Sequence, residues 1–140
     1  MAANTTPIFS KAPLIGLSDA VPILTANTTV NLTSGTIYLL FTADATNGSY
    51  VDKVIIQPLG TNIATAGRLW INNGSTTGTA TNNTQFKDFT LAATTVSQVA
   101  GVGNTEIFVG FGLPASYRIY MTLGTTVAAG FLSTVVAGQY

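Results

Sequence analysis

Short apolar runs of period two, separated by turn residues, are the feature that most constrains the fold of this chain. In residues 106–111, Ile107, Val109 and Phe111 occupy every second position, and Leu69 and Ile71 do so in residues 68–72. This spacing puts alternate side chains on one face of a β-strand. Asn-Gly pairs at positions 47–48 and 73–74 are typical of the tight turns that join strands. The pattern therefore predicts antiparallel β-structure.

Other runs extend this pattern along the chain. In residues 36–42 we expect Ile37, Leu39 and Phe41 to share one face, and residues 116–122 and 126–136 alternate similarly. Weaker runs predict strands near residues 21–24, 28–32, 52–57, 85–91 and 95–99. The spacing of Phe86 and Phe89 breaks the alternation and predicts a bulge. The chain is thus expected to be all-β, an antiparallel two-sheet sandwich or jelly roll.

The 140 residues suit one domain. Residues 1–19 contain prolines and lack a period, so they predict an extended N-terminal arm, and residues 20–140 form the sandwich domain. Residues 72–84 (NNGSTTGTATNNT) contain no apolar side chain larger than alanine. That segment predicts a long exposed loop between two strands, because it has little to bury.

Charge is scarce in this sequence. Only 7% of residues are charged, five basic and five acidic, against about 25% in typical soluble domains. A net charge near zero gives little attraction to nucleic acid or to anionic membranes. No apolar run approaches the roughly 20 residues of a membrane-spanning helix. We therefore expect no nucleic-acid or membrane partner, and we expect association with other protein surfaces.

The sequence also lacks the residues most often used in catalysis. It has no histidine and no cysteine, which excludes the usual general base, the thiol nucleophile and thiolate metal sites. The candidate carboxylates are scattered singly: Asp19, Asp44, Asp52, Asp88 and Glu106. The prediction is a protein that is not an enzyme, with no cofactor and no catalytic or metal-binding residues.

Two polar patterns have more than one interpretation. Residues 44–49 (DATNGS) offer oxygen donors that calcium prefers, but a single carboxylate is few, and the same residues describe a hairpin turn. The turn is favoured. Asn-x-Ser/Thr triplets could be glycan acceptors in a secreted protein. The first residues do not resemble a secretory signal, so we attribute the triplets to a composition rich in Asn and Thr; they begin at Asn4, Asn27, Asn31, Asn47, Asn73 and Asn82.

Aromatic residues beside arginine supply the candidate interface. Trp70 and Tyr120 are expected to share a face with Arg68 and Arg118, an arrangement that suits a sugar ring or a protein partner. The alternative is that one aromatic face is simply buried by the sandwich. The full candidate interface set is Arg68, Trp70, Phe108, Tyr120 and Tyr140.

Several segments in order along the chain carry a family resemblance: ANTTPIF at 3–9, IG at 15–16, DKVII at 52–56, PLGTN at 58–62, RLWINNG at 68–74, LPASY at 113–117 and LGTTVAAG at 123–130. Together they resemble small virion proteins of tailed bacteriophages, including capsid cement or decoration proteins of freshwater cyanophages. The resemblance implies a jelly-roll-like sandwich that trimerises on the capsid exterior at local three-fold positions, with the major capsid protein as partner. It implies no catalytic residues.

Two functions follow as expectations. The first is a structural virion protein that binds the outer surface of a phage capsid at capsomer junctions and stabilises the shell as a homotrimer. The alternative is a carbohydrate- or receptor-binding module of a phage tail or fibre. Copy number distinguishes them, because a cement protein is present in hundreds of copies per virion and a fibre tip in tens or fewer.

Overall fold

The computed structural model describes residues 11–17 and 21–140 of the chain. Over these residues the chain forms strands and loops, with a single 3-10 turn, η1 (Ala80–Asn82), as its helical element. The strands are β1 (Ala12–Leu17), β2 (Tyr38–Thr42), β3 (Ser49–Pro58), β4 (Thr65–Asn72), β5 (Asn83–Leu91), β6 (Thr105–Leu113), β7 (Arg118–Leu123) and β8 (Phe131–Gln139). The all-β prediction is confirmed. None of the described helical structure is long and apolar enough to cross a membrane.

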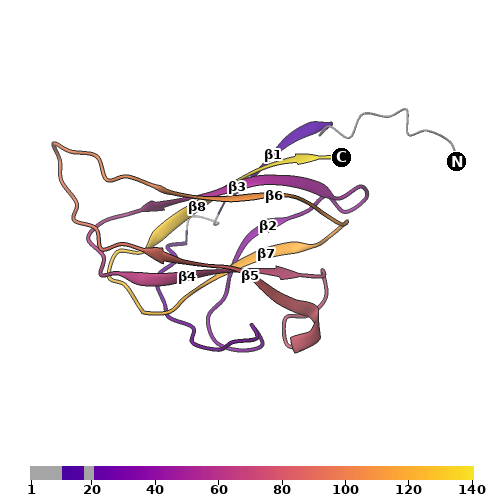
Figure 1. Ribbon diagram of the computed structural model, residues 1–140, viewed down its shortest axis with the longest axis horizontal. Coiled ribbons are helices and arrows are strands. Elements are labelled where there is room, and N and C mark those ends of the chain that lie inside the picture. The colour runs from indigo at the N-terminus through magenta and orange to yellow at the C-terminus, as the bar shows by residue number, and fades with distance from the viewer. Residues whose placement is uncertain (1–10, 18–20) are drawn as a thin grey trace, which may run out of the picture.

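The strands form two four-stranded antiparallel sheets that pack face to face (Figure 1). We call the sheet with strand order β1-β8-β3-β6 the upper sheet and the sheet with order β2-β7-β4-β5 the lower sheet. The chain changes sheet at every connection except the β4–β5 hairpin. This interleaved order is that of a jelly roll, which confirms the fold class.

The core lies between the sheets and follows the predicted alternation over most strands. Leu69, Val109, Ile119 and Met121 are buried there, while Ile71, Ile107 and Phe111 are partly buried against them. The predicted bulge is also present: Leu69 pairs with Lys87 and Trp70 with Gln85, so Phe86 is the extra residue on β5.

The predicted face of β2 is wrong for Ile37 and Leu39, although Phe41 is buried as expected. The pairing of β2 with β7 shifts register between Leu39 and Phe41. As a result two consecutive residues, Leu40 and Phe41, are buried, whereas Leu39 is exposed and Ile37 packs outside the main core. A β-bulge adds one residue to the strand, so the side chains before it point to the opposite face from the one that strict alternation predicts.

The predicted arm is replaced in part by a strand. Residues 12–17 form β1 and pair antiparallel with β8 from Ala12–Gln139 to Leu17–Thr134. Leu14 packs against the core. The domain therefore begins at least as early as residue 12, and residues 1–10 and 18–20 of the predicted arm lie outside the described residues.

Three predicted strands are loops. Residues 21–24 and 95–99 contribute no strand; isolated bridges join Ile23 to Phe131 and Asn62 to Thr94. Residues 28–32 belong to a loop that we call the strap, residues 27–36. Asn27 organises the strap: its side-chain nitrogen donates to the carbonyls of Ser34 and Thr36, and its side-chain oxygen accepts the backbone N–H of Thr29. These bonds replace the strand that β-branched Thr and Val residues would favour.

The polar segment between β4 and β5 is an ordered loop. Asn82 donates to the carbonyl of Thr76, and Asn83 donates to the carbonyls of Thr77 and Thr79. Asn83 also donates to the carbonyl of Asn31, which ties this loop to the strap. The loop is largely exposed as expected, but its asparagines supply the internal bonds that apolar residues do not.

Candidate interaction surfaces

Trp70 and Tyr120 do not reach the surface of the folded chain. They pair across β4 and β7 on the outer side of the lower sheet, and Arg68 and Arg118 belong to the same face, as expected. Leu32 of the strap covers them, so the exposed fractions of Trp70 and Tyr120 are 2% and 8%. Leu32 is itself buried with a left-handed φ of 62°. The assignment of these two aromatic residues to an accessible interface is therefore corrected, because the strap occupies that face.

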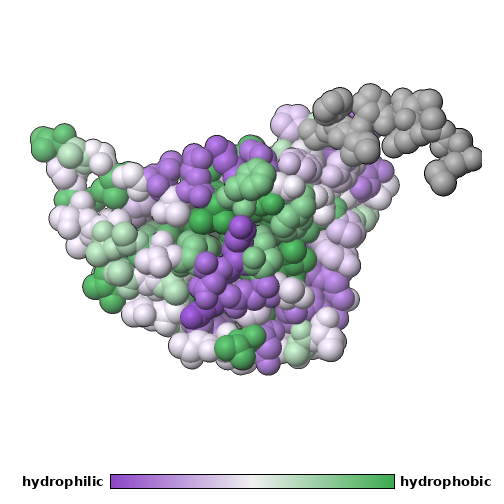
Figure 2. Space-filling model, viewed as in Figure 1, coloured by the Kyte–Doolittle hydropathy of each residue, from purple (hydrophilic) through white to green (hydrophobic). Residues whose placement is uncertain are grey.

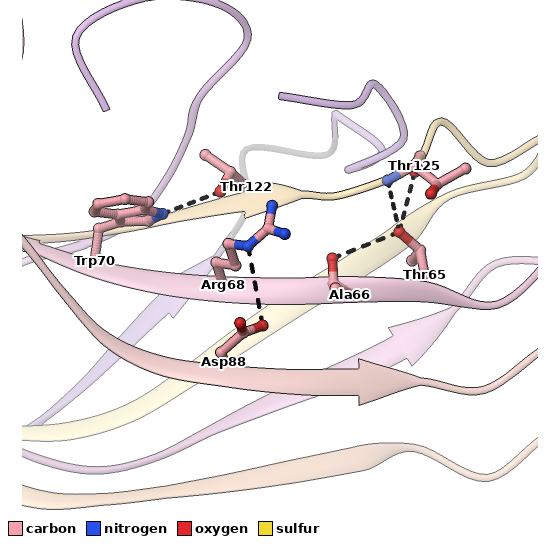
Figure 3. Close-up of polar contacts among 7 residues, drawn as sticks. All are labelled: Thr65, Ala66, Arg68, Trp70, Asp88, Thr122 and Thr125. Atoms are coloured by element: carbon pink, nitrogen blue, oxygen red, sulfur yellow. Dashed lines mark hydrogen bonds and ion pairs between the residues drawn. The ribbon is translucent and has the colours of Figure 1, made fainter. Parts of the chain in front are cut away.

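Arg68 lies beside this buried cluster (Figure 3). Its Nε is 3.9 Å from Oδ1 of Asp88 on β5, and both side chains are partly exposed. A surface pair at that distance contributes little to stability. Trp70 packs against Leu32 of the strap and donates a hydrogen bond to Thr122, and Tyr120 is also buried. Neither ring is therefore exposed beside Arg68.

Phe108 and Tyr140 lie on the outer side of the upper sheet. Phe108 is 67% exposed, and its ring folds onto Gly110, which has a φ of 70°. The Tyr140 hydroxyl occupies the place that a side chain at position 112 would take. Glycines at these two positions therefore allow aromatic rings to lie flat on the sheet. Sequence reasoning selected both residues but did not show that glycines seat them.

The outer side of the upper sheet is open over its described residues. Register partners form one row of Ile15, Val136, Lys53 and Phe108 across the four strands, and a second row of Leu17, Thr134, Ile55 and Glu106. Ile15, Leu17 and Phe108 are all more than half exposed. The two charged side chains in these rows, Lys53 and Glu106, pair with each other at 3.1 Å.

One end of the sandwich forms a second surface, which we call the tip platform: residues 59–64, 92–104 and 124–130. None of its residues is charged or aromatic. Asn62, which is 3% exposed, joins the three loops. Its backbone exchanges two hydrogen bonds with Thr94, and its side-chain oxygen accepts the N–H groups of Ala129 and Gly130 at 2.9 Å. Sequence reasoning missed this residue, because an asparagine two residues after a turn glycine gave no sign of burial.

The tip platform carries exposed aliphatic side chains. Leu59, Ile63, Val96 and Val99 are exposed, and Val99 reaches 98%. Figures 1 and 2 show the β5–β6 loop extending from one end of the sandwich with hydrophobic residues at its extremity. Solitary exposed aliphatics are common, but four in one uncharged, hydrogen-bonded group suggest a contact surface.

The carboxylate of Asp44, in the candidate calcium loop, is bound by backbone N–H groups of its own turn. Oδ1 of Asp44 accepts the backbone N–H of Asn47 at 2.7 Å and of Thr46 at 3.0 Å. The Asn47 N–H, followed by that of Thr46, holds the pKa of this carboxyl below its usual value. Residues 44–49 thus form the favoured turn. Among residues 11–17 and 21–140, no group of three or more potential metal ligands comes together.

Several Asn-x-Ser/Thr triplets have a structural role that composition alone did not suggest. The side-chain oxygen of Asn27 accepts both the N–H and the hydroxyl of Thr29, and Asn31 binds Thr33 in the same way. Asn73 accepts the N–H of Ser75. Each is an Asx turn, in which the side-chain oxygen of the asparagine accepts the backbone N–H of the residue two places later.

Comparison of the chain with protein-family models, with curated proteins and with solved structures gave no match.

Proposed function

We propose that this protein is a non-enzymatic structural component of a tailed-phage virion that binds the outside of the capsid at capsomer junctions as a homotrimer, with the major capsid protein as partner. The observation that carries the proposal is the tip platform. It is uncharged and carries exposed aliphatic side chains, and hydrogen bonds of Asn62 join its three loops. Such a surface gains free energy by being buried, at about 25 cal/mol per Å² of apolar area.

The chemistry of the platform favours a protein partner. Its residues include no lysine or arginine to bind phosphates and no tryptophan or tyrosine of the kind enriched at membrane interfaces. A projecting loop with Val99 at its extremity fits a recess, and a junction between subunits supplies one. The resemblance described above implies a capsid, and the junctions between its capsomers would supply such recesses.

Binding to shells stripped of the protein tests this proposal. Wild-type protein should rebind at hundreds of copies per particle, and Val99→Asp should bind at least about 10-fold more weakly, since it buries a charge in an apolar contact. Val30→Asp, at an exposed strap position outside the platform, serves as the matched control. Undiminished binding by Val99→Asp would exclude the platform as the contact.

The alternative, a carbohydrate- or receptor-binding module of a tail or fibre, is favoured by a different observation. Tyr50, Phe108 and Tyr140 lie on the outer side of the upper sheet, and Tyr50 pairs with glycines on both neighbouring strands. Flat aromatic groups of this kind can stack on sugar rings. Tens of copies or fewer per virion, together with saturable glycan binding that is lost in Phe108→Ser, would favour this alternative over the capsid role.

A further inference from the structure

We propose that Asn47 is a modification site, at which the side-chain amide is lost spontaneously to give an acidic residue. The chain contains the triplet Asn-Gly-Ser twice, at residues 47–49 and 73–75. Asparagine is one of the thermolabile residues of proteins. A glycine that follows it has no Cβ to hinder attack by its backbone nitrogen. Because the two triplets are identical, a large difference between their rates in the folded protein comes from the structure around them.

The reaction needs only the two residues and water. The backbone nitrogen of Gly48 attacks Cγ of Asn47, which forms a new C–N bond and breaks the bond from Cγ to Nδ2. Nδ2 takes the proton of the attacking nitrogen and leaves as ammonia, so that a succinimide ring remains. Water then opens the ring at one of its two carbonyl carbons. One opening gives aspartate, and the other gives isoaspartate, in which the backbone runs through the former side chain.

The side chain of Asn47 is free to turn toward the attacking nitrogen. Asn47 is exposed in the turn between β2 and β3, and among residues 11–17 and 21–140 its amide group has no hydrogen-bond partner. Its backbone N–H is bound to Oδ1 of Asp44 at 2.7 Å, which fixes the backbone of the turn and leaves the side-chain amide unbound. The N–H of Gly48 makes a longer bond, of 3.2 Å, to the carbonyl oxygen of Asp44.

The side chain of Asn73, in contrast, is held at both of its polar atoms. Its nitrogen donates to the side-chain oxygen of Asn82 at 3.1 Å, and its oxygen accepts the backbone N–H of Ser75 at 3.1 Å. The N–H of Gly74, which would have to attack, is bound to the side-chain oxygen of Asn72 at 2.9 Å. These bonds must break before the ring can close, so the fold protects this copy of the triplet.

The exposed triplet lies at the end of the sandwich opposite to the tip platform, because β3 (Ser49–Pro58) runs from this turn to residue 59. The inference therefore does not depend on the proposed binding to a shell. Gly48 has a φ of 78° and no room for a Cβ beside the carbonyl oxygen of Leu113, and its own carbonyl accepts the N–H of Tyr140. The longer backbone of isoaspartate must shift these contacts, whereas aspartate adds only a negative charge to a chain of zero net charge.

Peptide mapping after incubation in mildly alkaline buffer tests the proposal. Trypsin places the two triplets in separate peptides, residues 12–53 and 69–87. Fragmentation in the mass spectrometer locates each conversion, and heavy-oxygen water labels it, because the new carboxyl oxygen comes from the solvent. In the folded protein, conversion should be at least about 10-fold faster at Asn47 than at Asn73, whose side chain is held by two hydrogen bonds.

The unfolded chain is the control for local sequence. In denaturant the two rates should become similar, because the bonds that protect Asn73 are lost. Equal rates in the folded protein would overturn the proposal. So would the absence of conversion at Asn47 over a period in which the denatured chain converts, or a difference between the two sites that persists unchanged in denaturant.

Variants test the cause of the difference. Asn47→Gln, whose longer side chain closes a ring more slowly, should abolish the acidic form separated by ion exchange, and the matched Asn73→Gln should retain it. Asn82→Ala removes the acceptor of the Asn73 amide and should speed conversion at Asn73 without changing that at Asn47. An unchanged rate at Asn73 in this variant would contradict protection by that bond. Circular dichroism verifies folding, and mapping of the wild-type chain stays decisive if a variant does not fold.

Discussion

The indole N–H of Trp70 donates a 3.0 Å hydrogen bond to the hydroxyl oxygen of Thr122 on the neighbouring strand (Figure 3). Both residues are buried. The bond satisfies the polar atom that a buried tryptophan brings with it, so the strap can close over the ring without leaving that donor unpaired.

Replacing Thr122 by valine should destabilise the protein by about 1–3 kcal/mol, because the shape is retained while the Trp70 N–H loses its acceptor. Thr122→Ser keeps the hydroxyl and should recover most of the loss. The measurement is urea unfolding followed by tryptophan fluorescence, which is specific because Trp70 is the single tryptophan. Equal stability of the valine and serine variants would show that the bond contributes little.

Asn62→Ala should cost on the order of 3 kcal/mol, since the buried N–H groups of Ala129 and Gly130 would lose their acceptor. Asn73→Ala is the matched control. It also removes Asx hydrogen bonds, but at an exposed site, so its cost should stay below about 1 kcal/mol. Denaturant unfolding measures both, and similar losses at the two positions would contradict a special role for Asn62.

The pKa of Asp44 predicts how acid affects stability. The folded-state pKa lies below its usual value because of the N–H groups of Asn47 and Thr46. Its contribution is therefore fully present above the unfolded pKa of about 3.9 and is lost as the pH falls through the folded value. Wild-type protein should exceed Asp44→Ala in stability at pH 7, and the difference should shrink as the pH falls below the unfolded pKa of about 3.9. Thermal unfolding across pH measures this difference, and one that grew towards low pH would reverse the expected sign.

Asn83 should control the order of two loops at once. Its side chain binds the carbonyls of Thr77 and Thr79 in the β4–β5 loop and that of Asn31 in the strap. In Asn83→Ala, limited proteolysis should become faster in both residues 73–82 and residues 28–33. Gln85→Ala, at an exposed position on the same strand, should leave cleavage unchanged. Faster cleavage in the β4–β5 loop alone would show that the two loops are independent.

The sandwich was predictable because its strands obey period two where one face is buried. Strands β4, β6 and β7 show this alternation in Leu69, Val109 and Ile119 and their neighbours. The direction of Trp70, away from the main core, was also predictable. Its burial was not, because it depends on Leu32 in a loop 38 positions earlier, held by asparagine bonds that hydrophobic periodicity does not record.

Two other differences between the predicted and the observed strands have local causes. The face of β2 depends on a bulge that no glycine or proline marks in residues 38–42. Strand β1 was missed because Leu14 and Ile15 are both apolar although they face opposite ways, so its six residues show no alternation. Of the candidate interface residues, Phe108 and Tyr140 lie on the outer side of the upper sheet. The tip platform was not predictable, because it arises from the way three separate loops meet.

The pairing of β1 with β8 has a practical consequence for engineering. Ala12 and Gln139 are register partners, so the first described strand starts where the last one finishes. A short linker from residue 140 to residue 12 would join them without crossing the domain, and new termini could be opened beside Val99, whose side chain is almost fully exposed. Cargo fused to such a permuted chain would leave from the opposite end of the sandwich, which gives two choices of direction for display from one scaffold.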